Sequence, residues 1–400
     1  MNGRERISFA MQHKEADRVP VMCQLALGHY FLNAGLAPHE IWFTSEGFAE
    51  ALVTMQRRYQ FDGILINLPG RPRNVLSEIK KVEKTPKGEL VTWRNGHVTI
   101  IPWDDNAQYV YPARPDLKPR ADLTTLDPDH LEMIDQYTGY IWNTYHIPWL
   151  ADKNDSGLLS EVPDYFLDTI DLVRAKTNGE VSVHGEVFSP FTHYLELIGY
   201  QNAIIGLVKN KEKVKALLER LSDASIAWAV AQAKRGVDAV LISSAFAGGG
   251  FISPKMYAEY VVPYERRVAD AVKEFNIPVY THTCGKIGDR LELMEQTGTM
   301  GIDTLDPHPL GNVELADAKN GVGQRLFLKG NMNSVSILEY TTKEEVLAEA
   351  TERIQIGKPG GGYILSSACS IAPRVEPWKI ELLTPLANEI GRYKNYDPLF

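Results

Sequence analysis

One histidine and two cysteines have the residue types and the spacing of a metal site. His282 and Cys284 belong to the segment PVYTHTC, and Cys369 ends the segment YILSSAC. Residues two apart in an extended strand point to the same side, so His282 and Cys284 can approach one ion together. Imidazole and thiolate suit Zn²⁺, and three protein ligands leave a fourth position open, as in catalytic zinc sites. Asp306 is a candidate weak fourth ligand that a substrate could displace.

A structural explanation of the same residues stays open at this point. A single His-x-Cys pair is a weak motif, because buried cysteines are commonly inert and a strand histidine is commonly a hydrogen-bonded core residue. Glycines lie close to both segments, at position 285 and at positions 360–362. They favour the metal site, because glycine permits close approach of the backbone.

The elements that position these residues are short apolar strands alternating with amphipathic helices. Eight segments have strand character: residues 18–23, 62–67, 181–187, 238–243, 279–283, 302–305, 326–329 and 363–367. Eight such units predict an α/β fold of the (β/α)8 type, a closed TIM barrel, although an open doubly wound sheet gives a similar pattern.

Residues from about 69 to 159 interrupt this alternation. They contain KGELVTWRNGHVTIIPWDDN, in which two alternating runs flank Asn95-Gly96, a pair that favours a β-hairpin with a tight type I′ turn. The Pro-, Asp- and Trp-rich remainder has no clear period. We therefore expect a single domain, residues 1–400, with an insertion at about 69–159 in its amino-terminal half that caps one end of the barrel.

The active site of such a barrel lies at the carboxyl ends of its strands. The side chains at or just beyond the predicted strand ends are polar or are soft metal ligands, and all three cysteines of the chain are among them. They are Cys23, Asn67, Glu186, Ser243, Ser244, His282, Cys284, Asp306, Asn331 and Cys369. Asn67, Ser243, Ser244 and Asn331 are candidates for binding substrate, and capping of strand ends is the structural alternative.

Composition restricts the partners and the location of the chain. A net charge of −9 is unlike the clustered Lys and Arg of a nucleic-acid interface, so no nucleic-acid partner is expected. No stretch approaches the roughly 20 apolar residues of a membrane span. The amino terminus, MNGRERISFAMQHKEADR, is too charged for a secretory signal, and three cysteines do not suggest a disulfide framework. We therefore expect a cytoplasmic protein without a membrane partner.

The sequence resembles the uroporphyrinogen decarboxylase superfamily over nearly its whole length, and within it the corrinoid-dependent methyltransferases. The similar segments are GRERISFAMQHKEADRVPV, HGEVFSPFTHYLELIGY, ISPKMYAEYVVPYERRV, HTCG, LKGNMNSV and GGYILSSACSIAP. The resemblance implies a (β/α)8 barrel, a Zn²⁺ ion bound by His282, Cys284 and Cys369, and methyl transfer. It also implies a corrinoid on a separate partner protein that docks over the barrel mouth.

Two methyl-transfer reactions fit this resemblance, and they differ in the small molecule that gives or takes the methyl group. One moves the methyl group of an aryl methyl ether to Co(I); the other moves it from methyl-Co(III) to a thiol such as coenzyme M. We favour ether demethylation, because Glu186 could protonate a departing phenolate and Phe188, Phe191 and Tyr194 could stack on a ring. Pairing of Glu186 with a rim arginine and core packing of the aromatics are the structural alternatives.

Two other classes of function are kept. Metal-free decarboxylation of uroporphyrinogen demands several arginines around the mouth for eight carboxylates, but this chain has CQLALGHY where decarboxylases carry an arginine-bearing motif. A metal-storing or corrinoid-binding protein without turnover would need no open ligand position. Metal content separates decarboxylation from methyl transfer.

Overall fold

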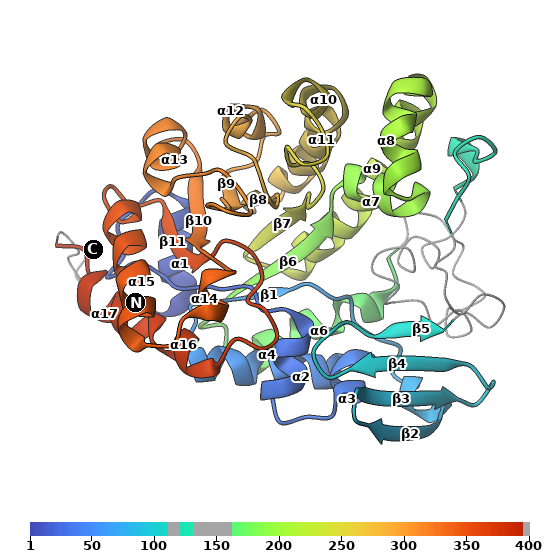
Figure 1. The fold of residues 1–400 in the computed structure, drawn as a ribbon, viewed down its shortest axis with the longest axis horizontal. Helices are drawn as coiled ribbons and strands as arrows, with labels where there is room; N and C mark the ends of the chain where they lie inside the picture. Colours follow the sequence, from blue (N-terminus) through green and yellow to red (C-terminus); the bar gives the residue numbers. More distant parts are fainter. Residues whose placement is uncertain (111–119, 132–161, 395–400) are drawn as a thin grey trace.

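A parallel sheet curls around the centre of the molecule (Figure 1). The computed structural model describes residues 1–110, 120–131 and 162–394. Seven strands follow one another in the order β1-β6-β7-β8-β9-β10-β11. They are β1 (Gly63–Ile66), β6 (Ser182–Phe188), β7 (Ala239–Ser243), β8 (Val279–His282), β9 (Gly301–Thr304), β10 (Phe327–Met332) and β11 (Tyr363–Ser367). Each overlaps one strand predicted from the sequence.

The predicted first strand, residues 18–23, closes this sheet into a barrel. Val21 forms a parallel bridge with Leu365 of β11, and its carbonyl accepts a 2.8 Å hydrogen bond from the amide of Asp62, just before β1. The segment therefore lies between the two edge strands. It forms isolated bridges rather than a regular ladder, since Pro20 has no N–H to donate. The (β/α)8 prediction is confirmed.

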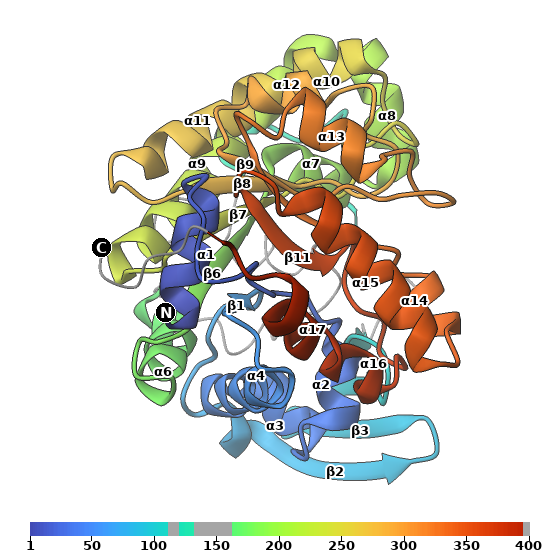
Figure 2. The ribbon, with the colours of Figure 1, turned by 90° about the vertical axis from the view of Figure 1, so that its left-hand side faces the viewer.

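Helices surround the barrel, as Figures 1 and 2 show. Some begin at a side chain that caps their free amides: Thr342 and Glu345, for example, form a reciprocal capping box at the start of α15. The α-helices are α1 (Gly3–Met11), α2 (Leu27–Asn33), α3 (Pro38–Phe43), α4 (Ser45–Tyr59), α6 (Asp168–Lys176), α7 (Pro190–Ile198), α8 (Tyr200–Lys209), α9 (Lys211–Arg235), α10 (Pro254–Tyr260), α11 (Val262–Lys273), α12 (Leu291–Glu295), α13 (Leu315–Gly321), α14 (Ser336–Glu339), α15 (Lys343–Gly357), α16 (Pro377–Glu381) and α17 (Leu383–Ile390). Short 3₁₀ turns are η1 (Val75–Glu78), η2 (Pro128–His130) and η3 (Asp164–Leu167).

The barrel interior is a packed apolar core at its amino-terminal end. Inward side chains of the strands, including Leu241, Tyr280 and Phe327, form one buried cluster with Ile7 and Met11 of α1. The amide of Arg4 in α1 bonds to the carbonyl of Glu180, just before β6, so this helix covers the amino-terminal end. The carboxyl ends of the strands are therefore the side on which a site can be built.

Part of the predicted insertion forms a second, antiparallel sheet beside α2 and α3 (Figures 1 and 2). Its strands are β2 (Ile79–Thr85), β3 (Gly88–Trp93), β4 (Val98–Pro102) and β5 (Gln108–Val110). Of this sheet, only the β3–β4 hairpin was predicted from the sequence. Residues 111–119 and 132–159 of the insertion lie outside the described residues, and the boundaries of the insertion and its capping role stay predictions.

The turn of the β3–β4 hairpin differs from the predicted type I′ turn. Such a turn needs a positive φ at both central residues, but at this pair only Gly96 has one, +86°. The Gly96 amide donates to the Trp93 carbonyl, and the Trp93 amide donates to the carbonyl of His97, across a three-residue loop. The Asn95 side chain accepts from the His97 amide. The type I′ assignment was wrong, because these bonds favour a type I turn followed by a left-handed glycine.

None of the described helices combines the length and the apolarity that crossing a membrane requires.

Candidate metal centre

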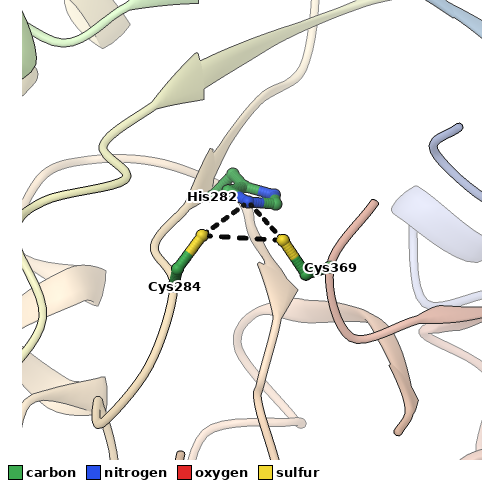
Figure 3. A group of neighbouring side chains, drawn as sticks. All are labelled: His282, Cys284 and Cys369. Atoms are coloured by element: carbon green, nitrogen blue, oxygen red, sulfur yellow. Dashed lines mark hydrogen bonds between the residues drawn. The ribbon is translucent and has the colours of Figure 1, made fainter. Parts of the chain in front are cut away.

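Three side chains converge at the carboxyl ends of β8 and β11 (Figure 3). Cys284 Sγ lies 3.3 Å from His282 Nε2 and 3.7 Å from Cys369 Sγ, and Cys369 Sγ lies 4.0 Å from His282 Nε2. Tetrahedral zinc with its usual bond lengths places nitrogen and sulfur about 3.5 Å apart and two sulfurs about 3.8 Å apart. The three donor atoms therefore fit one zinc ion with little movement.

The barrel strands supply this convergence. His282 is the last residue of β8, and its neighbours in the sheet register are Ser243 of β7 and Asp303 of β9. Gly285 adopts a φ of +79°, which a side chain disfavours, and the chain turns away directly after Cys284. Cys369 follows β11, where the Ala368 amide bonds to the carbonyl of Met332. Cys284 and Cys369, which are 85 residues apart in the sequence, thus meet at the carboxyl end of the barrel.

A buried carboxylate holds the other nitrogen of His282. Asp303 Oδ2 lies 2.8 Å from His282 Nδ1, and Asp303 Oδ1 accepts a 2.8 Å hydrogen bond from Lys329, which also contacts the Ser366 hydroxyl at 3.2 Å. Asp303 and Lys329 are 2% and 1% exposed. A carboxylate in this position fixes the ring orientation and leaves Nε2 free to bind a metal. Neither residue was among the candidates predicted from the sequence, although a charged residue inside each of two buried strands was a usable signal.

Hydrogen bonds and neighbouring charges set the protonation of each side chain in this group. Burial alone would raise the pKa of Asp303, but Lys329 and His282 outweigh it and lower the pKa to about 2. The hydrogen bond from Cys284, reinforced by His282, holds the pKa of Cys369 well below its usual range, while the pKa of Cys284 is raised. Burial would lower the pKa of His282, but Asp303 and Cys369 outweigh it and raise the pKa to about 10. Without a metal the group therefore holds an ionised carboxylate, one thiolate and an imidazolium. Metal binding would release the protons that remain on Cys284 and on His282 Nε2.

Asp306 lies beside the centre and has a different contact. Its Oδ2 accepts a 2.6 Å hydrogen bond from the Gly285 amide, which fastens the turn after Cys284. Burial raises the pKa of Asp306 to about 6. Within the described ranges, the donor atoms that lie within 4.8 Å of one another come from His282, Cys284 and Cys369 and do not include Asp306. A role as fourth ligand stays a prediction.

The three donors face a cavity of about 400 Å³ at the barrel mouth. Four of the predicted residues line it beside them: Asn67, Glu186, Phe188 and Ser243. Lining residues that the sequence analysis missed are Gln24, Leu25, Ala26, Leu27, Gly28, Trp42, Leu68, Asp104, Asp105, Asn106, Ala245, Ser370 and Pro373. Asp104, Asp105 and Asn106 lie in the turn between β4 and β5, so the insertion supplies part of the wall.

The structure does not bring the other candidates to this cavity. Phe191 and Tyr194 are buried in α7, where the Tyr194 hydroxyl donates to the carbonyl of Ala203. Ser244 follows Ser243 and points to the opposite side of the strand, and Asn331 donates its side-chain amide to the carbonyl of Leu305. Their substrate-binding roles stay predictions without a contact to support them.

Cys23 is the one cysteine outside the metal centre. It is buried beside Ser366 and Ser367, and burial raises the pKa of its thiol. This is the environment of an inert core cysteine.

Glu186 lines the cavity and carries a buried carboxyl group. The residue is 8% exposed, its Oε2 has no hydrogen-bond partner in the described part of the chain, and burial raises its pKa to about 7. The predicted alternative, an ion pair with a rim arginine, is not found among the described residues. A buried carboxyl group with a pKa near neutrality can accept or donate a proton at the substrate.

Comparison with known proteins assigns the family. The family model "Uroporphyrinogen decarboxylase (URO-D)" matches residues 150–390, more than half of the chain. Similar proteins include methylcobamide:CoM methyltransferases from Methanosarcina acetivorans (30% identical over 223 residues, 56% of this chain and 60% of the relative) and Methanosarcina mazei (28% over 240 residues, 58% and 65%). A uroporphyrinogen decarboxylase from Nitrosococcus oceani is 29% identical over 264 residues, 61% of this chain and 70% of the relative.

Structural similarity to known proteins extends over more of the chain than sequence similarity does. A solved methyltransferase from Methanosarcina mazei superimposes with a TM-score of 0.67 over 97% of this chain and 99% of that structure, at 17% identity. This likeness supports the barrel architecture alone, and the chain spans less than two thirds of the two methyltransferases named above. The matched family model and the closed barrel together establish that this chain belongs to the uroporphyrinogen decarboxylase family.

Proposed function

We propose that this chain is a zinc-dependent methyltransferase that moves a methyl group from a methyl-corrinoid to a thiol bound at the metal centre. The observation that carries the proposal is the set of distances among His282 Nε2, Cys284 Sγ and Cys369 Sγ, which fits three ligands of one zinc ion. The set leaves a fourth position for substrate, and it faces a cavity large enough for a small molecule. Two relatives named as methylcobamide:CoM methyltransferases support the same reaction.

The residues of the chain have separate tasks in this proposal. A bound zinc ion supplies Lewis acidity, which lowers the pKa of a thiol that binds to it. Asp303 orients the His282 ring, and Lys329 holds Asp303 in its ionised form. Glu186 takes the proton that the thiol loses, because it is a buried carboxyl group that lines this cavity and burial raises its pKa to about 7. The cavity wall aligns the sulfur for displacement at the methyl carbon.

The proposed acceptor differs from the ether that the sequence favoured. Ether demethylation keeps support from Glu186, which could protonate a phenolate, and from Phe188, whose ring lines the cavity. Phe191 and Tyr194 do not line it, and the two relatives are named for coenzyme M. The thiol reaction is therefore the better supported of the two.

Metal-free decarboxylation has less support. A substrate with eight carboxylates needs cationic partners, but none of the described residues that line the cavity is an arginine or a lysine. A protein that only stores a metal or binds a corrinoid without turnover would need no open ligand position at the metal centre.

The partner in this proposal is a corrinoid protein that docks over the barrel mouth, and the small molecule is a thiol. Location in the cytoplasm stays a prediction from composition.

An assay with free methylcobalamin tests the proposal. Zinc-loaded protein, methylcobalamin and the neutral thiol mercaptoethanol are mixed without oxygen, and the conversion of methylcobalamin to cob(I)alamin is followed by absorbance. We expect thiol-dependent conversion in the parent and a loss of at least about 100-fold in Cys369→Ser, which lacks one ligand. Methylation of Co(I) by a guaiacol-type ether, with no reaction of any thiol, would establish the ether reaction instead.

A further inference from the structure

The cavity in front of the metal centre has an acidic wall. Asp104 and Asp105 contribute to it from the turn between β4 and β5, and Glu186 contributes from β6. None of the described lining residues is a lysine or an arginine. Arg374 lies just outside the lining and pairs with Asp104 at 2.6 Å, but its side chain is 70% exposed. No ion pair of Asp105 with another described residue is found.

Close packing holds this acidic turn against the cavity. A Cβ atom at Gly28 in α2 would lie 2.4 to 2.7 Å from backbone atoms of Asp104, so only glycine lets the turn approach the helix this closely. The ion pair with Arg374 ties the same turn to the loop that follows Cys369. Two contacts of Asp104 therefore hold the turn to elements at the cavity, and Asp105 beside it is exposed.

One part of the wall, the start of α2, carries positive rather than negative charge. The first turn of α2 also lines the cavity, and its N-cap residue, Ala26, offers no side-chain acceptor to the free amides. A helix start carries about half a positive charge. Asp104 and Asp105 together carry about two negative charges, one of them offset by Arg374. Glu186 adds further negative charge when it is ionised, so the balance of the wall is negative.

We propose that the thiol accepted by this site carries a positively charged, ammonium-type group at the end away from its sulfur, and that Asp105 with Asp104 selects for it. The inference rests on the proposed function and defines its substrate class. This substrate class separates the chain from the relatives named for coenzyme M. Coenzyme M is a thiol that carries an anionic sulfonate at the end away from its sulfur. Like charges face each other when a sulfonate enters this cavity, and opposite charges when an ammonium enters.

Three thiols with the same two-carbon chain test the inference. They are cysteamine, which is cationic, mercaptoethanol, which is neutral, and mercaptoethanesulfonate (coenzyme M), which is anionic. Each is titrated into zinc-loaded protein by calorimetry and is also assayed with methylcobalamin. The same measurements are made on Asp105→Asn, which removes one charge from the wall. Asp270→Asn on α11 is the matched control, because it removes an exposed charge outside the lining of the cavity.

We expect cysteamine to bind and to react at least about tenfold better than mercaptoethanesulfonate in the parent. Asp105→Asn should reduce that ratio several-fold, and Asp270→Asn should leave it unchanged. Comparing ratios within each protein cancels the intrinsic reactivity of the three thiols. Equal or tighter binding of mercaptoethanesulfonate, or a ratio that Asp105→Asn does not reduce, would overturn the inference. Absence of turnover with all three would contradict the proposed function, while the binding data would still decide the charge preference.

Discussion

Replacement of Asp303 by asparagine separates two tasks of this carboxylate, orientation of His282 and neutralisation of Lys329. Asparagine has nearly the same shape but no charge. Lys329 Nζ lies 2.8 Å from Asp303 Oδ1, and at an effective dielectric constant of 20 the attraction at that distance is about 6 kcal/mol. Much of this is offset by desolvation, and removal of one partner of a buried pair typically costs about 3–5 kcal/mol.

We therefore expect metal-free Asp303→Asn to lose about 3–5 kcal/mol of unfolding free energy in urea titrations. Its zinc affinity, measured by competition with a chromogenic chelator, should fall about 10- to 100-fold, because His282 loses the partner that orients it.

The double variant Asp303→Asn with Lys329→Met is the control that distinguishes the two effects. It contains no unpaired buried charge, so most of the lost stability should return. Its zinc affinity should remain low, since His282 still lacks a carboxylate. A double variant as unstable as the single one would show that the ion pair is not the cause of the loss. Parental zinc affinity in Asp303→Asn would refute the orienting role.

Three further substitutions have defined outcomes. Glu186→Gln should lower kcat/KM about 10²- to 10⁴-fold and keep its zinc, and an unchanged rate would exclude it as the proton acceptor. Burial raises the pKa of Glu265 from 4.5 to about 8. The carboxyl group therefore stays protonated in the folded chain while it ionises in the unfolded chain, and stability falls as pH rises from about 4.5 to 8. Glu265→Gln should therefore gain as much as about 5 kcal/mol over the parent at pH 9 and little at pH 4, by urea titration; equal differences at both pH values would contradict this. Gly28→Ala should cost about 1–3 kcal/mol by the same titration, because the new methyl group meets the backbone of Asp104, and a neutral effect would show that the turn can move away.

The sequence predicted the parts of this molecule that depend on local pattern. Alternation of apolar strands with helices located every barrel strand, and the strand-end rule brought His282, Cys284 and Cys369 to one point. The closure of the barrel by residues 18–23 also followed from counting strands, although Pro20 reduces that strand to isolated bridges.

Contacts between distant segments limited the rest of the prediction. The predicted barrel makes β9 and β10 neighbours, but the register that places Asp303 beside Lys329 does not follow from a single sequence. The acidic turn at Asp104 reaches the cavity from a separate sheet. Phe191 and Tyr194 follow a strand end, as a pocket residue would, but the direction of α7 turns both rings into the core.

The metal content of the purified protein tests the central claim most directly. Elemental analysis should find about one zinc per chain in the parent and in Cys23→Ser, whose sulfur lies outside the metal centre, and a marked loss in Cys369→Ser. Equal zinc in parent and Cys369→Ser, or none in either, would contradict the assignment of His282, Cys284 and Cys369 as zinc ligands and with it the proposed methyl transfer.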